Sequence, residues 1–185
     1  MHTYTNHFMK RRSTSRELVA MALLFGACSA VLTAFNIPMN WGNPNLGTVP
    51  VSLAGCFSAP VAMVVGLIKG ASSSLVTGRG HVEMAAGIGD GLMGVVTFLL
   101  ARRIGVRHAV VGGQLSRFML TAGMVAISVA LVEHHDMSML GTVWWDILPA
   151  IALSVLANTV VSVVVLTLWG DRIGSLFSSF GNKNA

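Results

Sequence analysis

The sequence predicts an all-α integral membrane protein, a six-helix bundle whose second helix is short and partly buried. Apolar residues make up 54% of the 185-residue chain and charged residues only 10%, against roughly 25% in soluble domains. No Asp, Glu, Lys or Arg occurs from Leu18 to Ile68 or from Ile147 to Gly170, and a membrane span needs about 20 mainly apolar residues. The two cysteines both lie in apolar segments, which leaves no disulfide framework. These features exclude soluble enzymes, secreted disulfide scaffolds and disordered chains.

Apolar runs and the residues that interrupt them place the helices along the chain. Ser15 is a possible N-cap for the first segment, and Pro38 follows its end. The stretch 38–47 is rich in Pro, Asn and Gly and predicts a loop. Pro60 divides the run 50–77, because proline suits the first turn of a new helix and interrupts a continuing one. The expected segments are 17–37, 50–58, 60–77, 82–101, 110 or 113–132, and 145–169.

The distribution of basic residues predicts the topology. Cytoplasmic loops are enriched in Lys and Arg, so the basic clusters within 10–16 and 102–107 should both be cytoplasmic. An even number of crossings must then separate them, which requires two segments within 50–77. The piece 50–58 would be only about 14 Å long and cannot cross an apolar layer of about 30 Å, so we expect other helices to shelter it. The loop 133–146, with three acids and no Lys or Arg, is then external.

This topology divides the chain into three parts. We expect a cytoplasmic basic tail at 1–16, a six-segment transmembrane domain at 17–170 and a cytoplasmic tail at 171–185. The apolar run that follows the first tail is too long for the core of a removable signal peptide. Both termini therefore lie in the cytoplasm in this prediction.

Three ionisable residues, Lys69, Glu83 and Asp90, fall inside predicted spans, where such residues are costly and are functional candidates by default. Lys69 and Asp90 lie at the same predicted depth on neighbouring antiparallel helices. We therefore expect an ion pair between them, which either is purely structural or also binds a ligand. Glu83, on nearly the same helix face as Asp90, either lines that site or is solvated at the helix end. Arg117 is expected to snorkel to the cytoplasmic interface.

The remaining polar and aromatic candidates each have two interpretations. Asn158, midway along the last segment, either forms an interhelical hydrogen bond or contacts a ligand. Trp144 and Trp145 either anchor a helix end at the membrane interface or belong to a binding site. Residues 134–136 (His-His-Asp) carry metal-binding groups, but adjacent polar residues on a loop rarely form a site, and we predict no metal. Gly78–Gly80 lacks the Lys-Ser/Thr ending of a phosphate-binding loop.

The stretch Val49–Gly78 (VPVSLAGCFSAPVAMVVGLIKGASSSLVTG) combines an apolar helix, a break of small residues and proline, and a glycine-containing helix. In this stretch the chain resembles the substrate-binding (S) components of energy-coupling factor (ECF) vitamin transporters, and the resemblance extends over nearly the whole chain. Many members have Gly-Pro at the break, where this sequence has Ala59-Pro60. The resemblance implies a non-catalytic subunit of a prokaryotic cell membrane that captures a small water-soluble vitamin or vitamin precursor on the outer face.

The resemblance also implies partners. In this family a transmembrane coupling subunit and two ATPase subunits complete the importer, and these partners use the ATP, so no cofactor is expected in this chain. Ala22, Gly26 and Ala30 recur every four residues in the first segment and form the predicted partner-binding set. Ala22-xxx-Gly26 resembles in position a family Ala-xxx-Ala motif that contacts the coupling subunit. The alternative is that this small-residue stripe packs against the protein's own helices.

The first outer loop of the family closes over the ligand, which by position implicates Trp41, Asn43 and Asn45. The full predicted substrate-binding set is Trp41, Asn43, Asn45, Lys69, Glu83, Asp90, Trp144 and Asn158. Two other classes stay open. One is a self-sufficient ion-coupled permease, although the sequence shows none of the inverted repeats that many permeases have. The other, less favoured, is an intramembrane enzyme using Asp90, Glu83 and the external histidines, for which we find no nucleophile and base in register.

Overall fold

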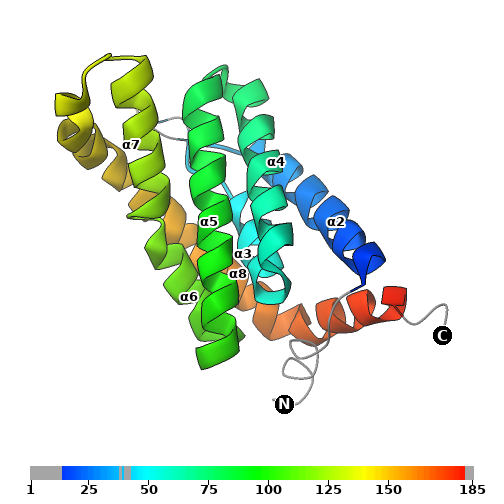
Figure 1. Cartoon of the computed structure of the whole chain (residues 1–185). Coiled ribbons are helices and arrows are strands. Elements are labelled where there is room, and N and C mark those ends of the chain that lie inside the picture. Colours follow the sequence, from blue (N-terminus) through cyan, green and yellow to red (C-terminus); the bar gives the residue numbers. More distant parts are fainter. Residues whose placement is uncertain (1–13, 38, 40–42, 182–185) are drawn as a thin grey trace.

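The computed structural model describes residues 14–37, 39 and 43–181, and within them every regular element is a helix (Figure 1). The elements are α2 (Ser15–Thr33), α3 (Thr48–Phe57), α4 (Ala59–Thr77), α5 (Gly80–Ile104), α6 (Val106–Ser116), α7 (Leu120–Val132), the short 3-10 helix η1 (Met137–Met139) and α8 (Leu140–Gly181). Five segments, 15–33, 59–77, 80–104, 106–132 and 137–173, are long and apolar enough to cross a membrane. With the shorter α3 as the sixth helix, the predicted fold class is confirmed, and the chain is a multi-pass membrane protein.

Helix α2 begins and ends differently from the prediction. Its N-cap is Thr14 and not Ser15, because Thr14 Oγ1 accepts from the backbone of Glu17 while the Glu17 carboxylate accepts from the Thr14 backbone, which forms a capping box. The helix ends at Thr33 instead of continuing to residue 37. Asn36 instead forms an isolated antiparallel bridge with Asn45. This bridge, together with the hydrogen bond from the Ile37 N–H to the Pro44 carbonyl, holds residues 44 and 45 beside the end of α2.

The break between α3 and α4 follows the predicted chemistry. Ser58 is extended, with φ −155° and ψ 123°, and its hydroxyl accepts from the backbone N–H of Val61, which caps α4 with Pro60 in the first turn. Nearly all of α3 is buried, from Thr48 to Cys56. The predicted sheltering of this short helix by the other helices is therefore confirmed.

Glycines allow α4 and α5 to lie side by side in close contact (Figure 1). A Cβ added at Gly66 would lie 2.6 Å from Cα of Gly91, and one added at Gly70 would lie 3.0 Å from Cα of Gly87. Both pairs therefore bring the two backbones closer than any larger residue allows. Because the helices are antiparallel and tightly packed, Lys69 of α4 comes to the level of Asp90 of α5.

The last two spans carry interruptions. Residues 117–119 form a turn between α6 and α7, so that one apolar segment of 27 residues contains two helices. Helix α8 has 42 residues and contains Pro149, and at about 63 Å it is longer than a membrane is thick. Figure 1 shows its last turns crossing the base of the bundle towards the start of α2, which it contacts. The expected tail at 171–185 is thus helical as far as Gly181, where the description of this end stops.

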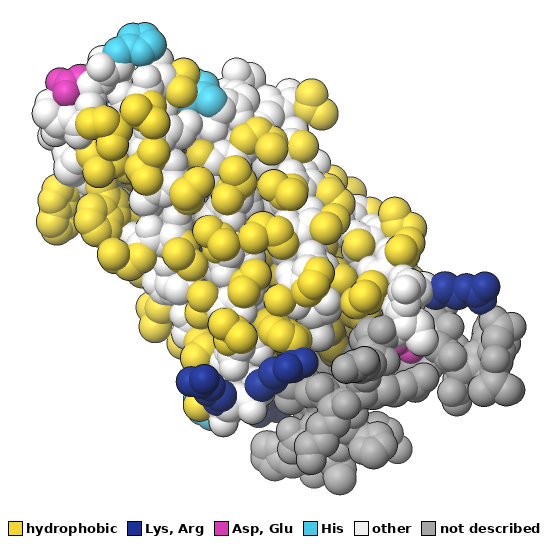
Figure 2. Space-filling view, in the orientation of Figure 1, with side chains coloured by type: hydrophobic (Ala, Val, Ile, Leu, Met, Phe, Trp, Pro, Cys, Tyr) yellow, Lys and Arg dark blue, Asp and Glu magenta, His cyan; other side chains and the backbone are white. Residues whose placement is uncertain are grey.

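Charged side chains gather at the two ends of the bundle. Arg102 and Arg103 lie exposed in the last turn of α5, and Figure 2 shows Lys and Arg side chains at the lower end of the bundle, where α2 begins and α5 ends. The same figure shows His and acidic side chains at the opposite end. Between the ends the surface is mainly apolar, with exposed side chains such as Leu23, Leu75 and Leu156. This band is what a membrane-embedded surface requires.

Candidate ligand-binding site

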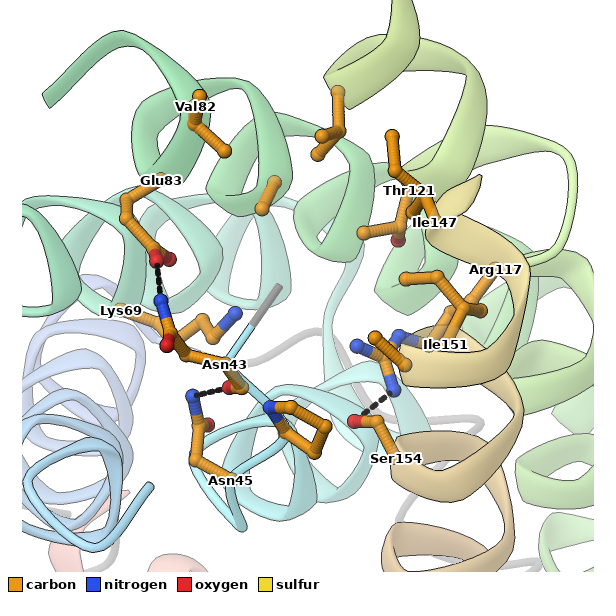
Figure 3. Close-up of a pocket in the computed structure, with 14 residues that line it drawn as sticks. Asn43, Asn45, Lys69, Val82, Glu83, Arg117, Thr121, Ile147, Ile151 and Ser154 are labelled. Atoms are coloured by element: carbon orange, nitrogen blue, oxygen red, sulfur yellow. Dashed lines mark hydrogen bonds between the residues drawn. The ribbon is translucent and has the colours of Figure 1, made fainter. Parts of the chain in front are cut away.

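A small cavity lies among α4, α5, α7, α8 and residues 43–45 (Figure 3), in the half of the bundle where α5 begins. Its internal volume is about 40 Å³, which is room for a few water molecules. One wall is apolar and comes mainly from α7 and α8, and the rest is polar and charged. The lining residues are Asn43, Pro44, Asn45, Lys69, Val82, Glu83, Ala86, Arg117, Thr121, Val125, Ile147, Ala150, Ile151 and Ser154.

Asp90 lies behind this cavity as the centre of a buried charge cluster. Lys69 Nζ lies 2.8 Å from Asp90 Oδ2, so the predicted ion pair is confirmed. Arg117 donates from Nε to Oδ1 over 2.8 Å, and the Thr121 hydroxyl donates to the same oxygen over 2.7 Å. The Asp90 side chain is fully buried. Both of its oxygens are therefore satisfied inside the protein, and the two cations face the cavity while the anion lies behind them.

The prediction for Arg117 is wrong, since this side chain does not reach the cytoplasmic interface. It is 3% exposed, and besides Asp90 it donates from Nη1 to Ser154 Oγ over 2.9 Å and to Gln114 Oε1 over 3.4 Å. The sequence reasoning began this segment at Val110 or Gly113, but the helical segment begins at Val106. Arg117 is then about 16 Å along the segment, too deep to snorkel. Its position in the turn at 117–119 directs it into the bundle.

Glu83 is a buried residue at the rim of the cavity and is not simply solvated. It is 4% exposed. Its Oε1 accepts from Asn43 Nδ2 over 2.7 Å and its Oε2 accepts from the Ser73 hydroxyl over 2.6 Å. Figure 3 shows the Asn43 bond joining α5 to the segment 43–45 across the cavity. Glu83 therefore fastens this segment to the bundle as well as lining the cavity.

Asn158 holds the same segment from the other side and does not line the cavity. Its Nδ2 donates to the backbone carbonyl of Asn45 over 2.8 Å and to the carbonyl of Ser154 over 2.7 Å. Asn45 in turn donates from its own Nδ2 to the Asn43 carbonyl over 2.8 Å. The expected interhelical hydrogen bond is not what forms, because Asn158 joins α8 to the non-helical segment 43–45 and otherwise bonds within its own helix. Asn43 and Asn45 themselves line the cavity.

Neither Trp144 nor Trp145 lines the cavity. Trp144 is half-buried, packs with the apolar cluster of α7 and α8, and donates from Nε1 to the Phe118 carbonyl over 3.2 Å. Trp145 is 74% exposed on α8, as expected of an interfacial anchor. Trp41 lies outside the described residues. Sequence reasoning instead missed Arg117, Thr121 and the small apolar wall, whose residues look like any others on an apolar helix.

The small-residue stripe of α2 is directed mainly into the bundle. Gly26 is buried, and a Cβ added there would lie 2.7 Å from Cδ1 of Ile68 on α4. Ala22 and Ala30 are half-buried, and Ala22 packs against the apolar core. At Gly26 the contact is therefore with the protein's own helix, which is the alternative that the sequence left open.

The outer loop after α7 holds polar residues without a metal cluster. Asp136 accepts from the backbone N–H and the hydroxyl of Ser138, and these hydrogen bonds hold the pKa of this carboxyl below its usual value. No group of three or more His, Cys, Asp or Glu side chains in the described part of the chain is placed to hold a metal ion. At the same end of the bundle, His81 Nε2 lies 3.2 Å from Glu133 Oε1 and links α5 to α7.

Comparisons with protein families, with curated proteins and with solved structures find no match to this chain.

Proposed function

We propose that this protein is the substrate-binding subunit of an ECF-type importer, which captures a small water-soluble vitamin or vitamin precursor at the outer face of a prokaryotic cell membrane. The observation that carries the proposal is the cavity that three buried ionisable residues, Lys69, Glu83 and Arg117, line together. Ionisable residues are costly inside a membrane and are functional candidates by default. The resemblance around Val49–Gly78 and the short, buried α3 support the same assignment.

The orientation follows from the charges at the two ends. Arg102 and Arg103 in the last turn of α5 lie at the end where α2 begins, compared with Arg79 at the start of α5, and the positive-inside rule favours a cytoplasmic position for this end. The cavity lies in the other half and therefore faces outside. A subunit that captures a ligand for import needs its site on this side.

The size of the cavity indicates how a ligand would fit. Binding pockets for small molecules usually hold about 300–1,000 Å³, far more than the few waters that fit here. Asn43 and Asn45 would have to move for a vitamin-sized ligand, which breaks the hydrogen bond between Asn43 and Glu83. Glu83 would then be available to the ligand. In this proposal the Glu83 carboxylate accepts from Asn43 in the empty site and from the ligand in the filled site.

We propose no catalytic role and no bound cofactor for this chain. Two partner ATPase subunits hydrolyse the ATP, and a transmembrane coupling subunit transmits the resulting conformational change to this chain. Because Gly26 faces α4, a coupling contact on α2 would use the half-buried Ala22 and Ala30 with the exposed side chains beside them, such as Leu23.

Purification from native membranes tests the proposal. We expect the full chain to co-purify with a coupling subunit and two ATPase subunits and to release a small molecule that mass spectrometry identifies. Uptake of that molecule should require ATP hydrolysis by the partners. Uptake by the chain alone, driven by a proton or sodium gradient, would show a permease instead. Chemical conversion of the molecule by the purified chain would show an enzyme.

A further inference from the structure

Two cations at the floor of the cavity retain donors that no described residue uses. The Lys69 ammonium has three N–H donors, and its hydrogen bond among the described residues goes to Asp90. The Arg117 guanidinium uses Nε and Nη1 for Asp90, Ser154 and Gln114. Its Nη2 has no partner in the described part of the chain. Both side chains line the cavity, and Figure 3 shows them approaching it from opposite sides.

The two cations at this floor share a single ion-pair partner. Lys69 and Arg117 share one carboxylate, that of Asp90. Glu83 forms an ion pair with neither cation within the described residues, and its oxygens accept from Asn43 and Ser73 instead. It also precedes Asp90 by about two helical turns, roughly 10 Å along α5. Asp90 is therefore the ion-pair partner of both cations, while the second carboxylate of the cavity is held by neutral donors.

The unused groups define the chemistry of what can bind there. Ammonium and guanidinium groups only donate hydrogen bonds, so the bound group must accept them. A neutral acceptor would leave the two cations with Asp90 as their shared ion-pair partner, and a cationic group would add positive charge beside them. An oxyanion meets both requirements, and charge-assisted hydrogen bonds of this kind are about twice as strong as neutral ones.

We infer that the ligand carries an oxyanion group, a carboxylate or a phosphate, which binds between the ammonium of Lys69 and Nη2 of Arg117. This inference rests on the proposed function and specifies the chemical class of its ligand. Asp90 acts as a positioning residue, which holds the two cations apart and directed at the cavity. The remainder of the ligand would lie along the apolar wall towards Glu83.

Small anions test this site without knowledge of the ligand. The purified full chain is melted in detergent with acetate, inorganic phosphate or acetamide at equal concentration, with chloride holding the ionic strength constant. A ligand that binds only the folded state raises the melting temperature with its concentration. We expect acetate or phosphate to raise it in a saturable way and acetamide to leave it unchanged. Which of the two anions acts identifies the group as carboxylate or phosphate.

Variants of Lys69 connect the effect to this cation. Lys69→Met should lower the affinity for the active anion at least about ten-fold, the loss of one charge-assisted contact. Lys69→Gln, which keeps a donor for Asp90, provides the same test if the first variant does not fold. The matched control is Arg103→Gln, which removes one positive charge from an exposed residue at the other end of α5 and should leave the anion effect intact.

Each result separates this inference from the proposed function. Equal effects of acetate and acetamide, or an anion effect that both Lys69 variants retain, would overturn the oxyanion site. A neutral or cationic molecule released from the native protein would also overturn it, while the role in ligand capture would stand. Saturable anion binding in a chain that never associates with coupling and ATPase subunits would support the site and contradict the importer.

Discussion

Lys69 and Arg117 lie on opposite sides of Asp90 and divide its carboxylate between them. Lys69 Nζ is 2.8 Å from Oδ2, and Arg117 Nε is 2.8 Å from Oδ1. All three side chains are buried, from α4, from α5 and from the turn before α7. Because one anion serves two cations, the three residues are not equivalent for stability.

Replacement of these residues should therefore give an order of stabilities. Lys69→Met leaves Asp90 with Arg117, Thr121 and, over 3.4 Å, the Thr48 hydroxyl as partners, so the loss should be that of one hydrogen bond to a charged group, about 1.5–3 kcal/mol. Asp90→Leu leaves two buried cations without an anion and should cost about 3–5 kcal/mol or more. Melting temperatures in detergent measure both. Equal destabilisation by the two substitutions would show that Arg117 does not compensate for Lys69.

The ion pair between Lys69 and Asp90 could be predicted from the sequence, because it depends only on how deep each residue lies in the membrane. Lys69 and Asp90 could be placed at one level because a short loop joins their helices. The depth of Arg117 could not be predicted, because it depends on where its helical segment begins. That segment begins at Val106, within a stretch whose basic residues, Arg107 among them, are typical of a loop. An arginine inside an apolar run was the available signal for its burial.

The walls of the site were less predictable still. Asn43 and Asn45 were identified by their place in the first outer loop, and they line the cavity. Ile147 and Ile151 on α8 are buried, whereas Leu153 and Leu156 on the same helix are exposed, although all four side chains are equally apolar in type. Only the rotation of α8 about its axis distinguishes them, and this rotation is set by packing against α7 and not by composition.

The close packing of α4 on α5 predicts that replacing a glycine by alanine destabilises the protein at this contact but not elsewhere. Gly66→Ala should lower the free energy of unfolding by about 1–3 kcal/mol, because its Cβ would lie 2.6 Å from the backbone of Gly91, which cannot move aside. Gly123→Ala in α7 is the matched control, since its Cβ meets nothing within 4 Å, and alanine there should stabilise the helix by up to about 1 kcal/mol. Thermal melts of the two variants measure this difference in stability. A Gly66→Ala protein as stable as the parent would contradict the packing.

The orientation of the α2 stripe predicts the effect of bulky residues at Gly26. Gly26→Ala should be tolerated because the nearest atom is the end of the Ile68 side chain. Gly26→Trp should destabilise the isolated protein by about 1–3 kcal/mol or more, as overpacking does. Leu23→Trp, on the exposed face of the same helix, is the control and should leave the melting temperature unchanged. If Gly26→Trp melts like the parent and only loses its partners, the stripe would be a coupling surface after all.

The arrangement of basic residues predicts the topology in the membrane. A reporter fused after Arg103 should be cytoplasmic, since this residue lies at the basic end of the bundle. A reporter fused after Asp136 should be external, because α7 ends just before it at the opposite end. Reporter activity on each side of the membrane is the measurement. An external position after Arg103 would contradict the orientation proposed for the cavity.

Glu83 offers a way to separate its structural role from a role in binding. In Glu83→Gln the amide oxygen can still accept from Asn43, and the amide N–H can donate to the Ser73 hydroxyl, which also accepts. Stability should therefore stay within about 1 kcal/mol of the parent, whereas Glu83→Ala loses both hydrogen bonds and should cost about 1–3 kcal/mol. If the ligand contacts the charged form, Glu83→Gln should retain less of the molecule that co-purifies with the protein. Mass spectrometry of that molecule beside the melting temperature tests both roles, and unchanged retention in the Gln variant would confine Glu83 to fastening the segment 43–45.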